Sequence, residues 1–181
     1  MDTCPQVNDT IKAVCDLVKA GVFMVIRQAV KEDAAVVGEV HSVAWKQTYQ
    51  GIFARGYIDE DSPSKRSSEF LSALDDERCV YLLLEEDSRA AGIVKLFSDG
   101  SKIEIASIYI LEEFRGLGFG REAIRYIRSE YKDQKVILWV LEVNTNARAF
   151  YEKCGFVLTD CVRTISRGGE FRQLMYASEG E

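Results

Sequence analysis

Three glycines within five residues are the feature of this sequence that most directly suggests chemistry: Gly116, Gly118 and Gly120. They follow an apolar segment, residues 103–110, and precede an amphipathic one, residues 121–131. Glycine lets the backbone turn tightly, so several amide N–H groups can point at one spot, and the first amides of a helix lack partners within it. Those amides and the helix dipole attract phosphate, and Arg115 and Arg121 add positive charge. The pattern predicts a diphosphate site between a strand and a helix.

Two other classes of phosphate-binding protein use the same kind of turn. A P-loop needs Lys and then Ser or Thr after its last glycine, whereas Arg121 and Glu122 follow Gly120 here. The dinucleotide fingerprint needs a small residue where Arg121 stands. The residues that remain, 121–181, are also too few for the rest of a doubly wound sheet. A nicotinamide-dependent enzyme is therefore the weaker alternative.

The turn matches R-x-x-G-x-G, which resembles the acyl-CoA pyrophosphate loop of the GNAT superfamily of N-acetyltransferases. A second segment resembles that family's N-x-x-A-x-x-F-Y-x-x-x-G-F motif at the same spacing: Asn144, Ala147, Phe150, Tyr151, Gly155 and Phe156. A weaker similarity covers the first strand and helix, with residues 26–29, Glu32, Asp33, Trp45, Tyr49 and Gly51. The resemblance spans about residues 24–178.

The resemblance implies an acetyl-CoA-dependent N-acetyltransferase that uses no metal and moves the acetyl group directly to a primary amine of a small molecule or peptide. It implies that the strands ending at Ile110 and starting near Val136 diverge, and that the pantetheine arm lies between them. The residues expected to hold CoA are Ile108, Tyr109, Ile110, Arg115, Gly116, Leu117, Gly118, Phe119, Gly120, Arg121, Asn144 and Phe150. The alternative is a non-catalytic acyl-CoA-binding regulatory module of the same fold.

Acetyl transfer to an amine requires that an alkylammonium, with a pKa of about 10.4, first lose its proton. Glu104 is our candidate base, acting directly or through a water, because many relatives carry a polar residue facing the acceptor cleft at this position. We expect its side chain to share a strand face with Ala106 and Ile108. The alternative is that Glu104 is a solvent-facing residue at the start of a strand.

Tyr151 matches the family's usual acid, which protonates the leaving thiolate, although an aromatic at this place in a helix also fits the core. Asn144 either caps the following helix or binds CoA. For the acceptor, the resemblance points to Trp45 and Tyr49 as pocket residues, and core packing is the alternative for both. The only histidine, His41, is expected to be a structural residue with satisfied hydrogen bonds.

Composition narrows the class of protein. A chain of 181 residues, 47% of them hydrophobic, fits one domain with one core. Five cysteines without a C-x-x-C pair argue against a disulfide framework and a zinc site. No apolar run reaches membrane-spanning length, and the net charge of −6 without a basic block disfavours nucleic acid as a partner. We expect a cytoplasmic protein, with a homodimer left open. The acidic balance mildly favours a cationic acceptor. The acidic run at residues 59–61 could recruit one, and a solvated loop is the alternative for it.

The order of elements predicts a single-domain α/β (α+β) fold like that of the resembled family, with helices on both faces of a mixed, mostly antiparallel sheet of about seven strands. Residues 1–22 are expected to be an extension, helical over 9–19, and residues 23–181 the acetyltransferase domain. The expected helices cover residues 31–49, 64–74, 121–131 and 145–153, with an irregular region at 51–64. The expected strands cover residues 24–29, 80–84, 90–97, 102–110, 136–143, 157–166 and 171–177.

Overall fold

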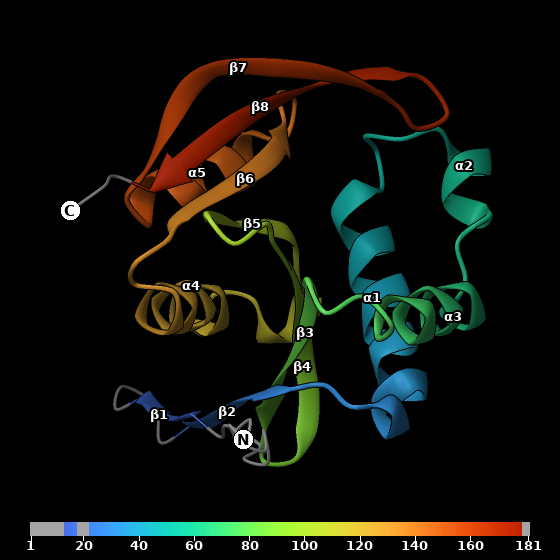
Figure 1. Cartoon of the computed structure of the whole chain (residues 1–181). Helices are drawn as coiled ribbons and strands as arrows, with labels where there is room; N and C mark the ends of the chain where they lie inside the picture. The colour runs from blue at the N-terminus through green and yellow to red at the C-terminus, as the bar shows by residue number, and fades with distance from the viewer. Residues whose placement is uncertain (1–12, 18–21, 179–181) are drawn as a thin grey trace, which may run out of the picture.

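This computed structural model describes residues 13–17 and 22–178 of the chain. The strands in these residues form one mixed sheet (Figure 1). Its strands lie in the order β1-β2-β3-β4-β5-β6-β8-β7. Only β5 and β6 are parallel, and every other neighbouring pair is antiparallel. The strands are β1 (Ala13–Leu17), β2 (Val22–Gln28), β3 (Cys79–Glu86), β4 (Arg89–Ser98), β5 (Lys102–Ile110), β6 (Lys135–Leu141), β7 (Phe156–Ser166) and β8 (Glu170–Ser178).

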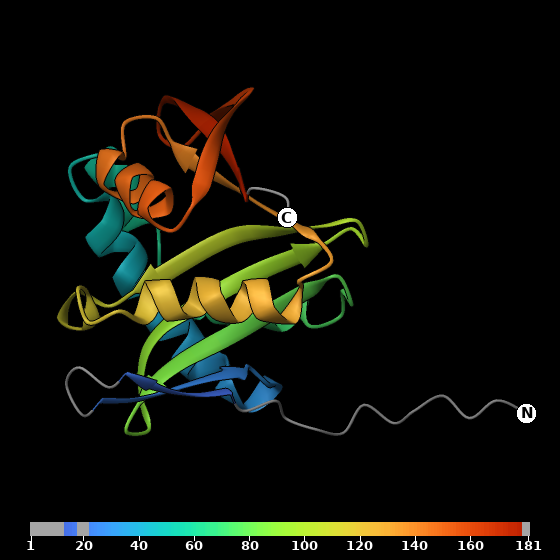
Figure 2. The ribbon, with the colours of Figure 1, turned by 90° about the vertical axis from the view of Figure 1, so that its left-hand side faces the viewer.

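Helices cover both faces of this sheet, so the expected fold class is confirmed. On one face lie α1 (Ala34–Tyr49), α2 (Arg55–Asp59) and α3 (Pro63–Ala73). On the other lie α4 (Phe119–Glu130) and α5 (Thr145–Lys153), which Figure 2 shows from their own side. Short 3-10 turns at Lys31–Asp33 and Glu112–Phe114 precede α1 and α4. The region expected to be irregular contains α2.

The central strands are apolar on both sides because helices bury both sides. In β3, Tyr81 and Leu83 pack with Phe70 of α3 and Val37 of α1. The alternate β3 residues instead join the core under α4. A strand that is buried on both faces has a continuous run of apolar residues rather than an alternating pattern. This explains why residues 79–84 of β3 are all apolar.

The first strand contradicts the sequence-based prediction of a helix over residues 9–19. Ala13–Leu17 pairs antiparallel with β2, with Ala13 opposite Ile26 and Leu17 opposite Val22. The remainder of the predicted helix lies outside the described residues. A short helix has weak intrinsic stability, whereas the open edge of β2 offers a row of backbone donors and acceptors. The extra pairing gives the sheet eight strands instead of about seven.

Strand β5 separates from β6 after a short parallel ladder, as expected. The ladder joins Lys102–Ile105 to residues 135–138, and no pairing between these strands follows it in the described residues. On its other side, β5 has a bulge, because Ser107 pairs with Lys95 while Ile105 pairs with the next β4 residue. The extra residue is Ala106, and it reverses the alternation of side chains along β5.

The bulge overturns one expectation about Glu104. Ile103 and Ile105 belong to the core under α4, and after the bulge Ile108 packs against that same core. Glu104 alternates with Ile103 and Ile105, so it points to the opposite face. Glu104 and Ile108 therefore do not share a face, because a simple period of two does not carry through a bulge.

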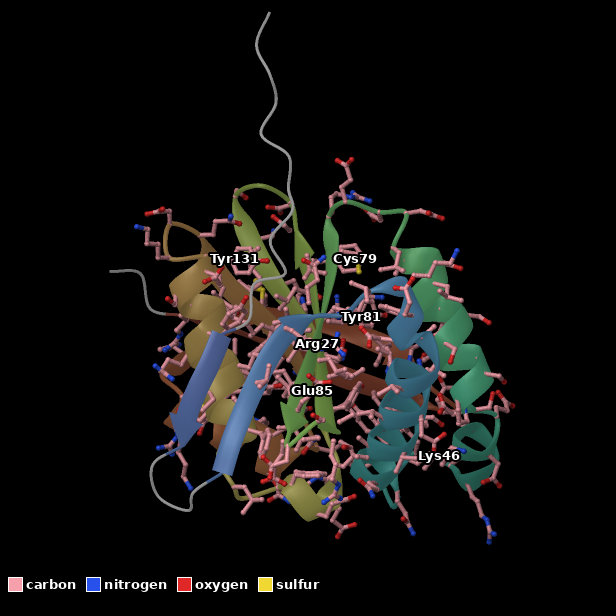
Figure 3. The ribbon with its side chains drawn as sticks, turned by 90° about the horizontal axis from the view of Figure 1, so that it is seen from below. Arg27, Lys46, Cys79, Tyr81, Glu85 and Tyr131 are labelled. Carbon is pink, nitrogen blue, oxygen red and sulfur yellow. The ribbon has the colours of Figure 1, made fainter. Side chains whose placement is uncertain are left out.

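An ionic cluster fixes the start of α1 against the sheet. Arg27 of β2 bonds Asp33 at 2.7 Å and Glu85 of β3 at 3.0 Å, all with side chains less than one-fifth exposed. Figure 3 shows Arg27 and Glu85 meeting across the two neighbouring strands. The hydrogen bonds that Arg27 donates hold the pKa of Asp33 below its usual value. Because these bonds are charge-assisted and partly buried, they set where α1 enters the fold.

The hairpin of β7 and β8 reaches across the end of the sheet to α2 (Figure 1). Phe171 of β8 contacts Phe53 with ring centroids 4.9 Å apart. At the tip, a Cβ added to Gly168 would lie 2.7 Å from Cβ of Tyr57 in α2, so only glycine allows this approach. The hairpin thereby contacts α2 and the segment that leads into it.

Candidate active site

The glycine turn has the backbone geometry of an anion cradle. Gly116 and Gly118 have φ of +77° and +100°, a region that glycine enters without strain, and α4 begins directly afterwards at Phe119. The Glu122 amide donates to the Gly118 carbonyl at 3.0 Å, and it is the first amide of α4 in the described residues that hydrogen-bonds to the glycine turn. The earlier amides, from Gly116 onward, are the donors that a diphosphate needs.

Phe119, Gly120 and Phe150 position this helix start through packing. Phe119 is 1% exposed and contacts the Phe114 ring. A Cβ on Gly120 would lie 2.9 Å from Cζ of Phe150 and 3.4 Å from Cδ1 of Ile110, so the third glycine permits close approach of α4 to α5 and β5. Of these three residues, only the backbone amides of Phe119 and Gly120 are placed to bind phosphate directly.

The two arginines at the turn differ in their contacts. Arg115 donates from Nε to the Ile110 carbonyl at 3.1 Å and from its guanidinium to Thr48 Oγ1 at 3.3 Å, so it ties the end of β5 to α1. Arg121 is exposed in the first turn of α4. Leu117, at the turn's tip, is 46% exposed. Arg121 is therefore the better placed of the two arginines for contact with a bound anion.

A narrow cleft of about 70 Å³ occupies the separation between β5 and β6. Ile108 and Tyr109 line it from β5, and Asn144 and Tyr151 line it from α5 and its start, so the structure brings these four predicted residues together. Ile110 is not among the lining residues, and its carbonyl already accepts from Arg115. The cleft has the extended strand edge that amide groups of a ligand can pair with.

Asn144 and Tyr151 have defined states in this cleft. The Asn144 side-chain oxygen accepts from the Ala147 amide at 3.1 Å, so it caps α5 while the residue also lines the cleft. Burial raises the pKa of the Tyr151 hydroxyl well above the ordinary phenol value, and the nearby Tyr49 and Cys154 raise it further. Tyr151 is therefore protonated near neutral pH, so its hydroxyl has a proton to donate.

A second, larger cavity of about 490 Å³ lies on the α1 and α3 face of the sheet. Trp45 and Tyr49, the two predicted acceptor-binding residues, form part of its wall. Phe53 stacks on Tyr49 with ring centroids 4.6 Å apart and extends that wall toward α2. The two cavities share Tyr49, Ala106, Ser107, Tyr109, Trp139 and Leu141, so they meet where β5 and β6 separate.

His41 and Ser107 line the larger cavity and were missed as site residues. His41 is 6% exposed and stacks on Tyr109 at 5.0 Å, and its Nδ1 has no hydrogen-bond partner in the described chain. The expectation that the hydrogen bonds of His41 are satisfied is thus wrong for Nδ1. Burial, and then the charges of Arg66 and Lys95, lower the pKa of His41 to about 3, so the ring is neutral. The sequence did offer one indication: His41 lies four residues before Trp45, a spacing that puts both side chains on one face of the helix.

Ser107 has the second unpartnered polar atom of this cavity. Its Oγ is buried without a partner among the described residues. The bulge at Ala106 is what turns Ser107 toward the cavity, so no pattern of alternation in the sequence could have identified it.

The larger cavity is lined by five cationic side chains and one carboxylate. The cations are Lys65, Arg66, Lys95, Arg163 and Arg167, and the carboxylate is Glu69. This is the reverse of the expectation from the acidic run at residues 59–61. Asp61 is 5% exposed, accepts from Ser42 Oγ at 2.6 Å and pairs with Arg66, so it cannot recruit an acceptor.

Glu104, the predicted base, lines neither cavity. It is half-buried on the β5–β6 ladder opposite Ile137, and its charge acts on Arg163. Two further findings concern the described residues alone. No group of three His, Cys, Asp or Glu side chains in them could hold a metal ion. None of their helices is both long and apolar enough to cross a membrane.

Comparison with known proteins agrees with this geometry. Residues 43–156 match the acetyltransferase (GNAT) family. The spermidine N(1)-acetyltransferase of Thermoplasma acidophilum is 26% identical over 143 residues, which cover 75% of this chain and 89% of that protein. The N-alpha-acetyltransferase of Sulfurisphaera tokodaii is 24% identical over 156 residues, which cover 84% and 91%.

Solved structures share the fold. The PaiA N-acetyltransferase of Thermoplasma acidophilum in complex with coenzyme A superimposes with a TM-score of 0.66 at 24% identity, covering 86% of this chain and 98% of that one. The ribosomal-protein-S18-alanine N-acetyltransferase of Escherichia coli gives 0.67 at 16% identity, covering 87% and 94%. The chain belongs to the acetyltransferase (GNAT) family and is an N-acetyltransferase that uses acetyl-CoA as its acyl donor.

Proposed function

We propose that this enzyme transfers the acetyl group directly to a primary amine of a small molecule or peptide that enters through the larger cavity. The observation that carries the proposal is the junction of the two cavities at the separation of β5 and β6. A donor held in the narrow cleft and an acceptor in the larger cavity would meet there without a covalent enzyme intermediate. The names of the relatives, which include spermidine and N-alpha acetyltransferases, support an amine acceptor.

On the donor side, the amides from Gly116 to Gly120 would bind the diphosphate, with Arg121 adding charge. Backbone groups of Ile108 and Tyr109 would pair with the amides of the pantetheine arm. The Asn144 amide group remains for CoA because only its oxygen is used in the cap. Acetyl-CoA supplies an acyl group on a sulfur leaving group.

On the acceptor side, the cavity itself favours the neutral amine. Removing a proton from an ammonium with a pKa of about 10.4 costs about 4.6 kcal/mol at pH 7 (about 3.4 units at about 1.36 kcal/mol each). The aromatic wall around Tyr49 and the cations Lys95 and Arg163 disfavour a further positive charge in the cavity. Both the wall and the cations therefore lower the pKa of a bound amine. This environment makes a strong carboxylate base unnecessary.

Tyr151 would stabilise the departing sulfur. A thiol has a pKa of about 8.5, below that of a phenol at about 10, so the tyrosine holds its proton and donates a hydrogen bond to developing thiolate charge. The proton released by the amine balances the thiolate once the N–C bond has formed and the C–S bond has broken. Tyr49 lines both cavities, whereas Tyr151 lines only the narrow cleft. Tyr49 would therefore orient the two reactants.

Thiol release tests this proposal. The enzyme is mixed with acetyl-CoA and a panel of amines, amino acids and peptides, and free CoA is measured with a thiol reagent. We expect amine-dependent release that Tyr151→Phe slows, while CoA affinity measured by calorimetry is retained. Tyr131→Phe, which changes a half-buried tyrosine at the end of α4 outside both cavities, is the matched control. Tight CoA binding without release for any amine would instead support the non-catalytic module.

A further inference from the structure

We propose that the acceptor amine carries an anionic group, a carboxylate or a phosphate, which binds among the cations of the larger cavity. This inference rests on the proposed function and specifies its substrate class. It excludes simple polyamines as the preferred acceptors, although a relative is named for spermidine.

The cations come from separate elements and converge on one cavity. Lys65 and Arg66 belong to α3, Lys95 to β4, Arg163 to β7, and Arg167 to the turn between β7 and β8. Since the whole chain has a net charge of −6, such a concentration of positive charge is not a consequence of overall composition. A cavity lined by one sign of charge concentrates ligands of the opposite sign.

Most of this charge is not neutralised by the protein. Arg66 pairs with Asp61 and with Glu69, which is the one carboxylate on the lining. The other four cations have no carboxylate within 4.0 Å in the described chain. Lys95 instead lies over the rings of Tyr81 and Phe97, each 5.3 Å from its Nζ.

Arg163 and Arg167 extend the charged surface to the other wall. Arg163 stacks over Trp139 at 4.3 Å and donates to Gln173 at 2.7 Å, contacts that fix the guanidinium without neutralising it. Burial lowers the pKa of Arg163, the charge of Glu104 raises it in part, and the neighbouring charge of Arg167 lowers it again. Adjacent cations that repel one another in a half-enclosed space are stabilised when an anion enters.

His41 and Ser107 supply the second, independent indication of a polar ligand. Both have a buried polar atom that is unpartnered in the described chain, and both line this cavity. A buried polar atom without a partner is costly, so a ligand group that bonds it gains affinity. The positive field acts on His41 as well, since Arg66 and Lys95 both lower its pKa.

The test compares amines that differ only in the anionic group. The pairs are O-phosphoethanolamine with ethanolamine, lysine with cadaverine, and glutamate with its α-monoamide isoglutamine, which has one carboxylate fewer, and spermidine is included. We expect kcat/KM at least tenfold higher for the more anionic member of each pair, and inorganic phosphate should inhibit competitively against the amine. The phosphate and carboxylate pairs show which anion the cavity prefers.

Two lysine variants locate the effect. Lys95→Met should reduce the preference within each pair at least fivefold while CoA affinity is unchanged. Lys135→Met, at the exposed start of β6 and outside both cavities, is the matched control and should keep the preference. Calorimetric binding of each anionic amine to the CoA-loaded enzyme gives a second measurement that does not depend on turnover.

The outcomes separate the two proposals. Equal or better turnover of the less anionic member of each pair or of spermidine, or no binding of any anionic amine to the CoA-loaded enzyme, overturns the anionic acceptor but leaves the acetyltransferase. An equal loss of preference in both lysine variants also overturns it. Failure of CoA to bind at the glycine turn overturns the proposed site geometry instead.

Discussion

Replacing Gly116 with Ala tests whether the turn's left-handed backbone holds the diphosphate. At φ of +77°, an L-residue is strained by about 1–2 kcal/mol, although the space around a new Cβ is open. In the free protein the exposed turn can relax by rotating its amides away from the cradle. CoA binding must then restore the original backbone, so we expect Kd for CoA to rise about 5- to 30-fold, the equivalent of that strain.

Calorimetric titration with CoA measures this change, and Gly100→Ala provides the matched control. Gly100 has φ of +87°, also with open space around it, but it lies in the turn between β4 and β5, away from the glycine turn. Only Gly116→Ala should weaken CoA binding, because the strain at Gly100 does not depend on bound CoA. Pantetheine, which lacks the diphosphate, should inhibit both variants equally. Equal CoA affinity in the two variants would refute the cradle.

Three further predictions address other residues of the site. Tyr151→Phe should lower the rate of thiol release in a single turnover by about 10- to 100-fold with little change in Kd for CoA, the size expected for loss of one donor to developing charge; an unchanged rate would remove Tyr151 from the chemistry. Glu104→Gln should leave the pH profile of kcat unchanged because Glu104 lines neither cavity; loss of the low-pH inflection would restore it as the base. The pKa of His41 is about 3 in the folded protein and about 6.5 in the unfolded chain, so the unfolded chain binds more protons between these two values. The free energy of unfolding should therefore rise with pH across that window, by at most about 5 kcal/mol (about 3.5 units at about 1.36 kcal/mol each). Urea unfolding from pH 4 to 7 should show a flatter dependence for His41→Gln, and identical slopes would contradict the burial argument.

The sequence determined the donor half of this enzyme. The glycine spacing and the Asn144 to Phe156 motif lie within short stretches of chain, and their physics is local: positive φ, a helix start and a side-chain cap. Such features can be predicted because few other residues influence them. The separation of β5 from β6 was instead implied by the resemblance to the acetyltransferase family, and the ladder that ends at Ile105 agrees with it. The strand at Ala13–Leu17 was not predicted, because an open sheet edge elsewhere in the fold decided it.

The acceptor half was decided by the tertiary structure. Its cations are spread over about 100 residues of sequence, from Lys65 to Arg167, and no local pattern marks them as neighbours. A single bulge at Ala106 changed which β5 side chains face the larger cavity. Asp61 belongs to the acidic run that suggested a cationic acceptor, but its side chain is buried and bonded to Ser42. The sign of charge in a cavity depends on which side chains converge and which are neutralised, and only the assembled sheet, helices and hairpin settle both.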